Sequence, residues 1–129
     1  SAGRGFKSRL PYQYQRSRMR SKRNEAIVCA DGFRMSVQGH ESAYCNPRAD
    51  DAEKYTEVEV GFPSEKEPLI VPWAEDKARL TETVYGYVPV SVVTNVIAKH
   101  GGIVRGQVPN GVPYLSALDD FLVDNSDKG

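Results

Sequence analysis

The sequence has few of the residues that build special scaffolds or special sites. Among 129 residues there are two cysteines, two histidines, two methionines and one tryptophan. Two cysteines are too few for a disulfide scaffold, and no apolar run approaches the roughly 20 residues that span a bilayer. The basic start lacks the apolar stretch of a signal peptide. We therefore expect one soluble domain in a reducing cytoplasm, with free, partly buried thiols at Cys29 and Cys45; a single disulfide is the alternative.

The net charge of the whole chain is zero, but the charges are unevenly distributed along it. The chain has 17 basic and 17 acidic residues. Residues 1–24 carry eight basic residues and no acid, whereas residues 25–129 carry nine basic and 17 acidic residues. This partition predicts a basic, flexible arm at 1–24 joined to a single acidic domain at 25–129. The arm has too little apolar area to fold alone, so we expect it to become ordered only against a partner.

Alternation of apolar and polar residues predicts a small antiparallel sheet. An apolar run at 26–30, the dipeptide Asp31-Gly32 and strict alternation over 33–38 indicate a β-hairpin at 26–38. Further strands are expected near 55–62 and 83–88, and short ones at 69–71 and 103–108. The proline-rich loop between them contains Trp73, which we expect to pin the loop to the core.

Helical spacing appears in the C-terminal part. Pro89 suits the first turn of a helix, and Gly101-Gly102 suits its end, so we predict a helix at about 89–100. A second helix is predicted at 113–123, with Leu115, Leu118 and Phe121 among its inward residues. Strands followed by helices indicate an α+β fold, with both helices on one face of the sheet.

No arrangement of residues indicates catalysis, a metal site or a cofactor. His40 and Cys45 lie in one loop but outside any known catalytic motif. The spacing of the cysteines and histidines does not fit a zinc finger. Glu57 and Glu59 share one face of a strand, which is typical of a solvated sheet face. We therefore expect no enzyme, no cofactor, no metal and no small-molecule substrate.

The basic arm carries the clearest functional signal. Its cations can release counterions from a nucleic acid, and interleaved aromatic rings can stack on bases. No motif for reading bases accompanies them. The alternatives are a protein partner, an arm that folds back on its own acidic domain, an arm that lies on a neighbouring copy, and a solvated tail. The residues predicted to bind nucleic acid or another polyanion are Arg9, Tyr12, Tyr14, Arg16, Arg18, Arg20, Lys22 and Arg23.

Several segments of the domain are similar to small uncharacterised proteins encoded by tailed bacteriophages. The similarity lies in residues 31–38, 44–48, 58–64, 83–89 and 100–102, and so covers roughly residues 31–103. It includes neither the basic arm nor the C-terminal segment. The resemblance implies a phage product that acts in the bacterial host cytoplasm or is carried in a virion, and it implies no particular activity.

These observations favour a non-enzymatic interaction protein that binds and modulates a host or phage macromolecule. The predicted surface for a protein partner is the acidic sheet face with Glu57 and Glu59, together with the loop around Trp73. The alternatives are a nucleic-acid-binding accessory protein that acts through the arm, and a structural component of the virion.

Overall fold

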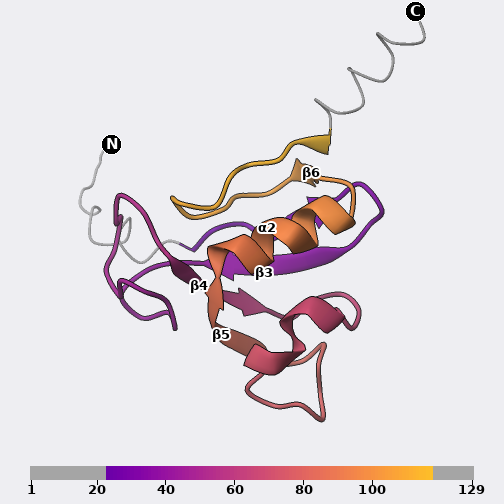
Figure 1. The fold of residues 1–129 in the computed structure, drawn as a ribbon, viewed down its shortest axis with the longest axis horizontal. Helices are drawn as coiled ribbons and strands as arrows, with labels where there is room; N and C mark the ends of the chain where they lie inside the picture. Colours follow the sequence, from indigo (N-terminus) through magenta and orange to yellow (C-terminus); the bar gives the residue numbers. More distant parts are fainter. Residues whose placement is uncertain (1–22, 118–129) are drawn as a thin grey trace, which may run out of the picture.

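A computed structural model describes residues 23–117 as a five-stranded antiparallel sheet with a helix packed across it (Figure 1). The α+β class predicted from the sequence is therefore confirmed. The elements are β2 (Ile27–Cys29), β3 (Arg34–Gln38), β4 (Glu57–Gly61), the 3-10 helix η1 (Pro68–Trp73), β5 (Val84–Pro89), α2 (Val90–Lys99) and β6 (Ile103–Arg105).

The predicted hairpin forms the centre of the sheet. Strand order is β5-β4-β3-β2-β6, and Ile27 pairs with Met35 across the hairpin. The turn is closed by the Asp31 carboxylate, which accepts a hydrogen bond from the Phe33 amide at 2.9 Å. Gly32 sits at φ +95°, a conformation that glycine adopts without steric cost.

Strands β4 and β5 and helix α2 confirm three further predictions. Val60 pairs with Tyr85, and the β4–β5 register shifts between Val58 and Val60, where β5 carries an extra residue. Helix α2 follows β5 directly and buries Val93, Val96 and Ile97 against the sheet. Glycines with positive φ end it, as the Gly101-Gly102 pair predicts.

The predicted short strand at 69–71 is wrong, because these residues belong to η1. The Glu67 side chain accepts a hydrogen bond from the Leu69 amide and so caps a helical turn. Pro68 and Pro72 have no amide hydrogen to give to a neighbouring strand. Trp73, at the end of η1, packs against the core as the sequence predicts.

The second predicted helix, at 113–123, is wrong over its first residues. Residues 113–115 are not helical: the Ile103 amide donates to the carbonyl of Leu115 at 2.7 Å, and Ile103 forms a parallel bridge with Ser116. The unpaired edge of β6 thus holds this segment extended, which overrides its helical periodicity. Leu115 is consequently exposed rather than inward. Residues 118–123 lie outside the described part of the chain.

Over residues 23–117, one hydrophobic core lies between α2 and the sheet. It includes Phe33, Met35 and Val37 of the hairpin region, whose inward alternation was predicted, and Tyr85 of β5. The core fixes the ends of three elements close together: the β2–β3 turn, the start of η1 and the C-terminal end of α2. These three ends carry the polar side chains of the first candidate site.

Candidate functional site

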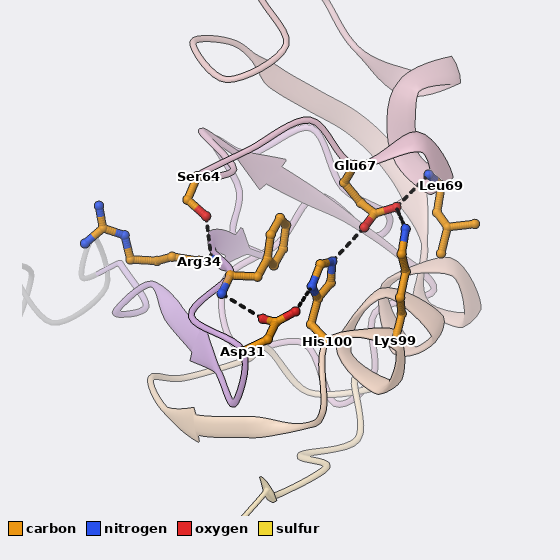
Figure 2. Close-up of polar contacts among 8 residues, drawn as sticks. Asp31, Arg34, Ser64, Glu67, Leu69, Lys99 and His100 are labelled. Atoms are coloured by element: carbon orange, nitrogen blue, oxygen red, sulfur yellow. Dashed lines mark hydrogen bonds and ion pairs between the residues drawn. The ribbon is translucent and has the colours of Figure 1, made fainter.

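Four charged side chains meet at these three ends, and we call them the His100 cluster: Asp31, Glu67, Lys99 and His100 (Figure 2). His100 Nδ1 lies 2.6 Å from Asp31 Oδ2, and His100 Nε2 lies 2.7 Å from Glu67 Oε1. Lys99 Nζ donates to the other Glu67 oxygen at 2.9 Å. Hydrogen bonds between Ser64 and the backbone of Arg34 hold the chain that leads to Glu67 beside β3.

The cluster is largely withdrawn from water. The side chains of Glu67 and His100 are 1% and 6% exposed, while that of Asp31 is half exposed. The Phe33 ring stacks on the imidazole with ring centroids 4.0 Å apart and planes only 10° from parallel. An ionised carboxylate at the depth of Glu67 is stable only because it is paired on both oxygens.

The protonation states follow from these contacts. Burial acts to lower the pKa of His100, but hydrogen bonds to Asp31 and Glu67 and their negative charges outweigh it, so the pKa is raised. Burial likewise acts to raise the pKa of Glu67, but the Leu69 amide, Lys99 and His100 together lower it. The Phe33 amide, followed by His100, lowers the pKa of Asp31. The cluster is therefore two carboxylates neutralised by an imidazolium and an ammonium.

This arrangement is suited to holding the fold together. Both imidazole nitrogens of His100 already bond to carboxylates, so an imidazolium donates at both ends. A general base needs a ring nitrogen that can take a proton from a substrate, and in this geometry both are engaged. We therefore interpret the His100 cluster as a structural junction between the hairpin turn, η1 and α2.

The junction predicts a bell-shaped dependence of stability on pH. The raised pKa of His100 stabilises the fold below pH 6.5, its ordinary value, and this contribution is lost as the pH rises through the folded-state pKa. The lowered pKa of Glu67 stabilises the fold above pH 4.5, its ordinary value, and is lost as the pH falls. Urea unfolding should thus give the largest free energy between pH 4.5 and 6.5.

The control for this profile uses the other histidine. His100→Gln should remove the decline above pH 6.5, whereas His40→Gln should leave it in place. Burial raises the pKa of Cys29 to about 11 from 9.0, so its own effect begins only near pH 9. A wild-type protein equally stable at pH 6 and pH 8.5 would contradict the assignment of an imidazolium at His100.

A second site lies on the molecular surface, around two tyrosines. The rings of Tyr44 and Tyr87 have centroids 6.0 Å apart and planes tilted by 32°. They remain 41% and 42% exposed, and the Arg48 guanidinium lies 5.8 Å from the centroid of the Tyr44 ring. We call this site the tyrosine surface and define it by Tyr44, Arg48, Glu59, Glu75 and Tyr87.

The backbone holds the two tyrosines together. The Tyr87 amide donates to the Tyr44 carbonyl at 2.9 Å, and the Tyr44 amide donates to the Glu59 carboxylate at 3.3 Å. Gly86 lets these segments approach, because a Cβ there would lie 3.1 Å from the Tyr44 Cβ and 3.4 Å from a carboxylate oxygen of Glu75. Both carboxylates therefore lie at the border of the aromatic pair.

Tyr87 has an unusual backbone for an exposed aromatic residue. Its φ is +57°, in the left-handed region, and Phe62 at the other end of the β4–β5 pair has φ +50°. This conformation costs a non-glycine residue roughly 1–2 kcal/mol. Strain of this kind concentrates at functional sites, and at Tyr87 it accompanies a ring turned toward solvent.

The structure brings together only part of the predicted protein-partner surface. Glu57 and Glu59 are both half-buried in β4, and Glu59 joins the tyrosine surface. Trp73 is packed against the core instead. Sequence reasoning missed Tyr44 and Tyr87 themselves, which are 43 residues apart. The available signal was Gly86, since an isolated glycine within a strand pattern indicates a bulge or a close backbone approach.

Most of the predicted nucleic-acid-binding residues lie outside the described residues. These are Arg9, Tyr12, Tyr14, Arg16, Arg18, Arg20 and Lys22. Arg23 is described, and its guanidinium lies 3.3 Å from His40 Nε2. The next residue, Asn24, is joined to the end of β3 by hydrogen bonds with Gln38 and Val37.

The two thiols are free, as predicted, and they are fully rather than partly buried. Burial raises the pKa of Cys29 and of Cys45, which keeps both thiols protonated. Cys45 Sγ contacts the backbone carbonyls of His40 and Pro47, not the imidazole. A catalytic cysteine needs the opposite environment, one that lowers its pKa. Over residues 23–117, no group of three histidine, cysteine or acidic side chains is arranged to hold a metal ion.

Comparison with known proteins gave no match to a family model, to a curated protein or to a solved structure. Within the described part of the chain, no helix has the length and apolarity required to cross a membrane.

Proposed function

We propose that this chain is a non-enzymatic interaction protein that binds another macromolecule through the tyrosine surface. The observation that carries the proposal is the exposed Tyr87 ring, held beside Tyr44 by a strained, left-handed backbone. The extra residue in β5 places Tyr87 in this conformation, and the result is an exposed ring fixed beside a second exposed tyrosine.

The composition of this surface supports a protein partner. Tyrosine and arginine are enriched among the residues that dominate binding energy in protein interfaces. Tyrosine offers a large apolar area with few rotatable bonds, so little conformational entropy is lost on binding. Here Tyr44 and Tyr87 are also fixed to each other through the backbone, so the pair is organised before a partner arrives.

The charge of the described residues also favours a protein partner over a nucleic acid. Residues 23–117 carry 13 acidic and nine basic side chains, a net charge of −4. Phosphates would be repelled by the carboxylates that border the tyrosine surface. Nucleic-acid binding through the basic arm is retained as the alternative function, as is a role in a virion. The setting we propose, from the phage resemblance, is a host or phage protein as partner.

Affinity capture with matched variants tests the proposal. The full chain is immobilised in a lysate of the cells in which it is made, with nuclease added. Wild type should recover a partner in stoichiometric amount, and Tyr87→Asn should recover at least tenfold less. Asparagine tolerates the left-handed conformation, so the unfolding free energy should stay the same or rise by up to about 1 kcal/mol.

Two controls separate binding from folding. Phe62→Asn makes the same change at another exposed left-handed aromatic residue, one outside the tyrosine surface, and its recovery of the partner should equal that of wild type. Tyr114→Asn removes an exposed tyrosine near β6, at the opposite edge of the sheet from β5. Recovery by Tyr114→Asn should equal that of wild type. Equal recovery by Tyr87→Asn and wild type would contradict the proposal, and a partner lost only on nuclease treatment would favour the nucleic-acid alternative.

A further inference from the structure

The tyrosine surface lies beside the point where the chain enters the described fold. Arg23 contacts His40, which precedes Tyr44 in the same loop. The Asn24 amide donates to the Gln38 side chain at 2.8 Å, and the Gln38 amide group donates back to the Asn24 carbonyl at the same distance. These contacts fix the start of the described chain at the C-terminal end of β3.

The sheet register gives the distance between Asn24 and the tyrosine surface. Gln38 pairs directly with Glu59, and the Glu59 carboxylate accepts the hydrogen bond from the Tyr44 amide. Neighbouring strands lie roughly 4.8 Å apart. Asn24 lies beside Gln38 on the β2 side of β3, so it is about two strand spacings from Glu59 in β4 and about three from β5, which carries Tyr87.

The segment that precedes this point is complementary in charge to the surface. Residues 1–22, which we call the basic segment, contain seven basic residues and no acid. The tyrosine surface has the carboxylates of Glu59 and Glu75 at its border, and Glu57 lies two residues away in β4. Arg48 and Lys77 are the cations nearby: Arg48 lies over Tyr44, and Lys77 bonds to carbonyls of residues 72 and 74. Within residues 23–117, the cation–π contact is that of Arg48 with Tyr44, so the Tyr87 ring can take a further cation.

We propose that the basic segment binds to the tyrosine surface of its own chain. Its arginines supply guanidinium groups that stack on Tyr87 and pair with Glu59 and Glu75. Tethering at Arg23 raises the effective concentration of the segment to the millimolar range, so weak contacts are enough for occupancy. An extended chain covers roughly 3.3 Å per residue, so residues 16–22 span the distance.

This contact goes beyond the proposed function, because it regulates access to the same surface. A segment that occupies the tyrosine surface competes with an external partner. The contact is electrostatic and at the molecular surface, so salt weakens it. The protein would then bind its partner more tightly when the basic segment is displaced or neutralised.

Nuclear magnetic resonance on the full chain tests the contact without a partner. The variant with Arg16→Gln, Arg18→Gln, Arg20→Gln and Lys22→Gln removes four charges and leaves residues 23–117 unchanged. Its amide resonances should move at Tyr44, Glu59, Glu75 and Tyr87, and stay in place at Val104 and Tyr114, near the opposite sheet edge. Raising salt from 20 to 500 mM should move the wild-type resonances in the same direction.

Either of two results would overturn the proposal. Resonances of the tyrosine surface that are the same in wild type and variant, and insensitive to salt, show that the segment does not bind there. Shifts that grow with protein concentration show binding to a second copy, which contradicts docking within one chain. Because the readout requires no partner, a failure of partner capture leaves this test unaffected, and the reverse also holds.

Discussion

Glu67→Ala is expected to lower the free energy of unfolding by about 3–5 kcal/mol, the range for removing one partner from a buried ion pair. The Glu67 carboxylate accepts hydrogen bonds from Lys99, His100 and the Leu69 amide, and its side chain is only 1% exposed. The variant loses the helix cap of η1 as well, and it leaves His100 protonated against Asp31 alone or neutral. Urea unfolding at pH 6 measures the loss.

The matched control is Glu65→Ala, two residues earlier in the same segment. Glu65 is exposed, and exposed substitutions usually change stability by less than about 0.5 kcal/mol. The Glu67 variant should also show a smaller decline in stability above pH 6.5, because His100 keeps only Asp31 as a carboxylate partner and its pKa is raised less. If both alanine variants unfold with similar free energies, the His100 cluster is not the junction described above.

Gly106→Ala is expected to destabilise the fold by about 2–5 kcal/mol, the sum of backbone strain and overpacking. Gly106 follows β6 at φ +115°, and a Cβ there would lie 2.4 Å from the Ala26 carbonyl oxygen and 2.5 Å from the Ile27 Cα. Both atoms are backbone at the start of β2, so the chain must move and the β2–β6 pairing must open.

Gly32→Ala separates the two causes. Gly32 has φ +95°, yet a Cβ there would meet no atom within 4 Å. The Gly32→Ala variant should therefore lose only the free energy of the backbone strain, about 1–2 kcal/mol. The difference between the two variants in urea unfolding isolates the overpacking at Gly106. Equal losses would show that the close approach of β6 to β2 does not constrain the fold.

The elements that the sequence predicted are those with a local cause. The hairpin at 26–38 follows from one turn dipeptide and the alternation beside it, and α2 follows from its apolar stripe and its terminal glycines. The errors have non-local causes. Residues 113–116 contain a helical pattern, but Leu115 and Ser116 pair with the open edge of β6 at Ile103. Residues 69–71 have the composition of a strand, but Glu67 caps them into a 3-10 helix.

Neither candidate site could be predicted from local sequence patterns. In the His100 cluster, Asp31 is 69 residues from His100 and Glu67 is 33 residues from it. Glu67 also lies between lysine and proline in a polar stretch, and such a stretch is typical of a solvent-exposed segment. The sequence placed Glu59 in a binding surface, and the structure puts it beside Tyr44. The left-handed backbone of Tyr87 depends on the extra residue in β5, so the strand pattern alone could not reveal it.

The most direct test of the account is the affinity of the captured partner for the purified variants. Titration calorimetry should give a dissociation constant at least tenfold weaker for Tyr87→Asn than for wild type, and within twofold of wild type for Tyr114→Asn. Urea unfolding should show that Tyr87→Asn is at least as stable as wild type. Unchanged affinity in a stable Tyr87→Asn protein would contradict the claim that the tyrosine surface is the binding surface.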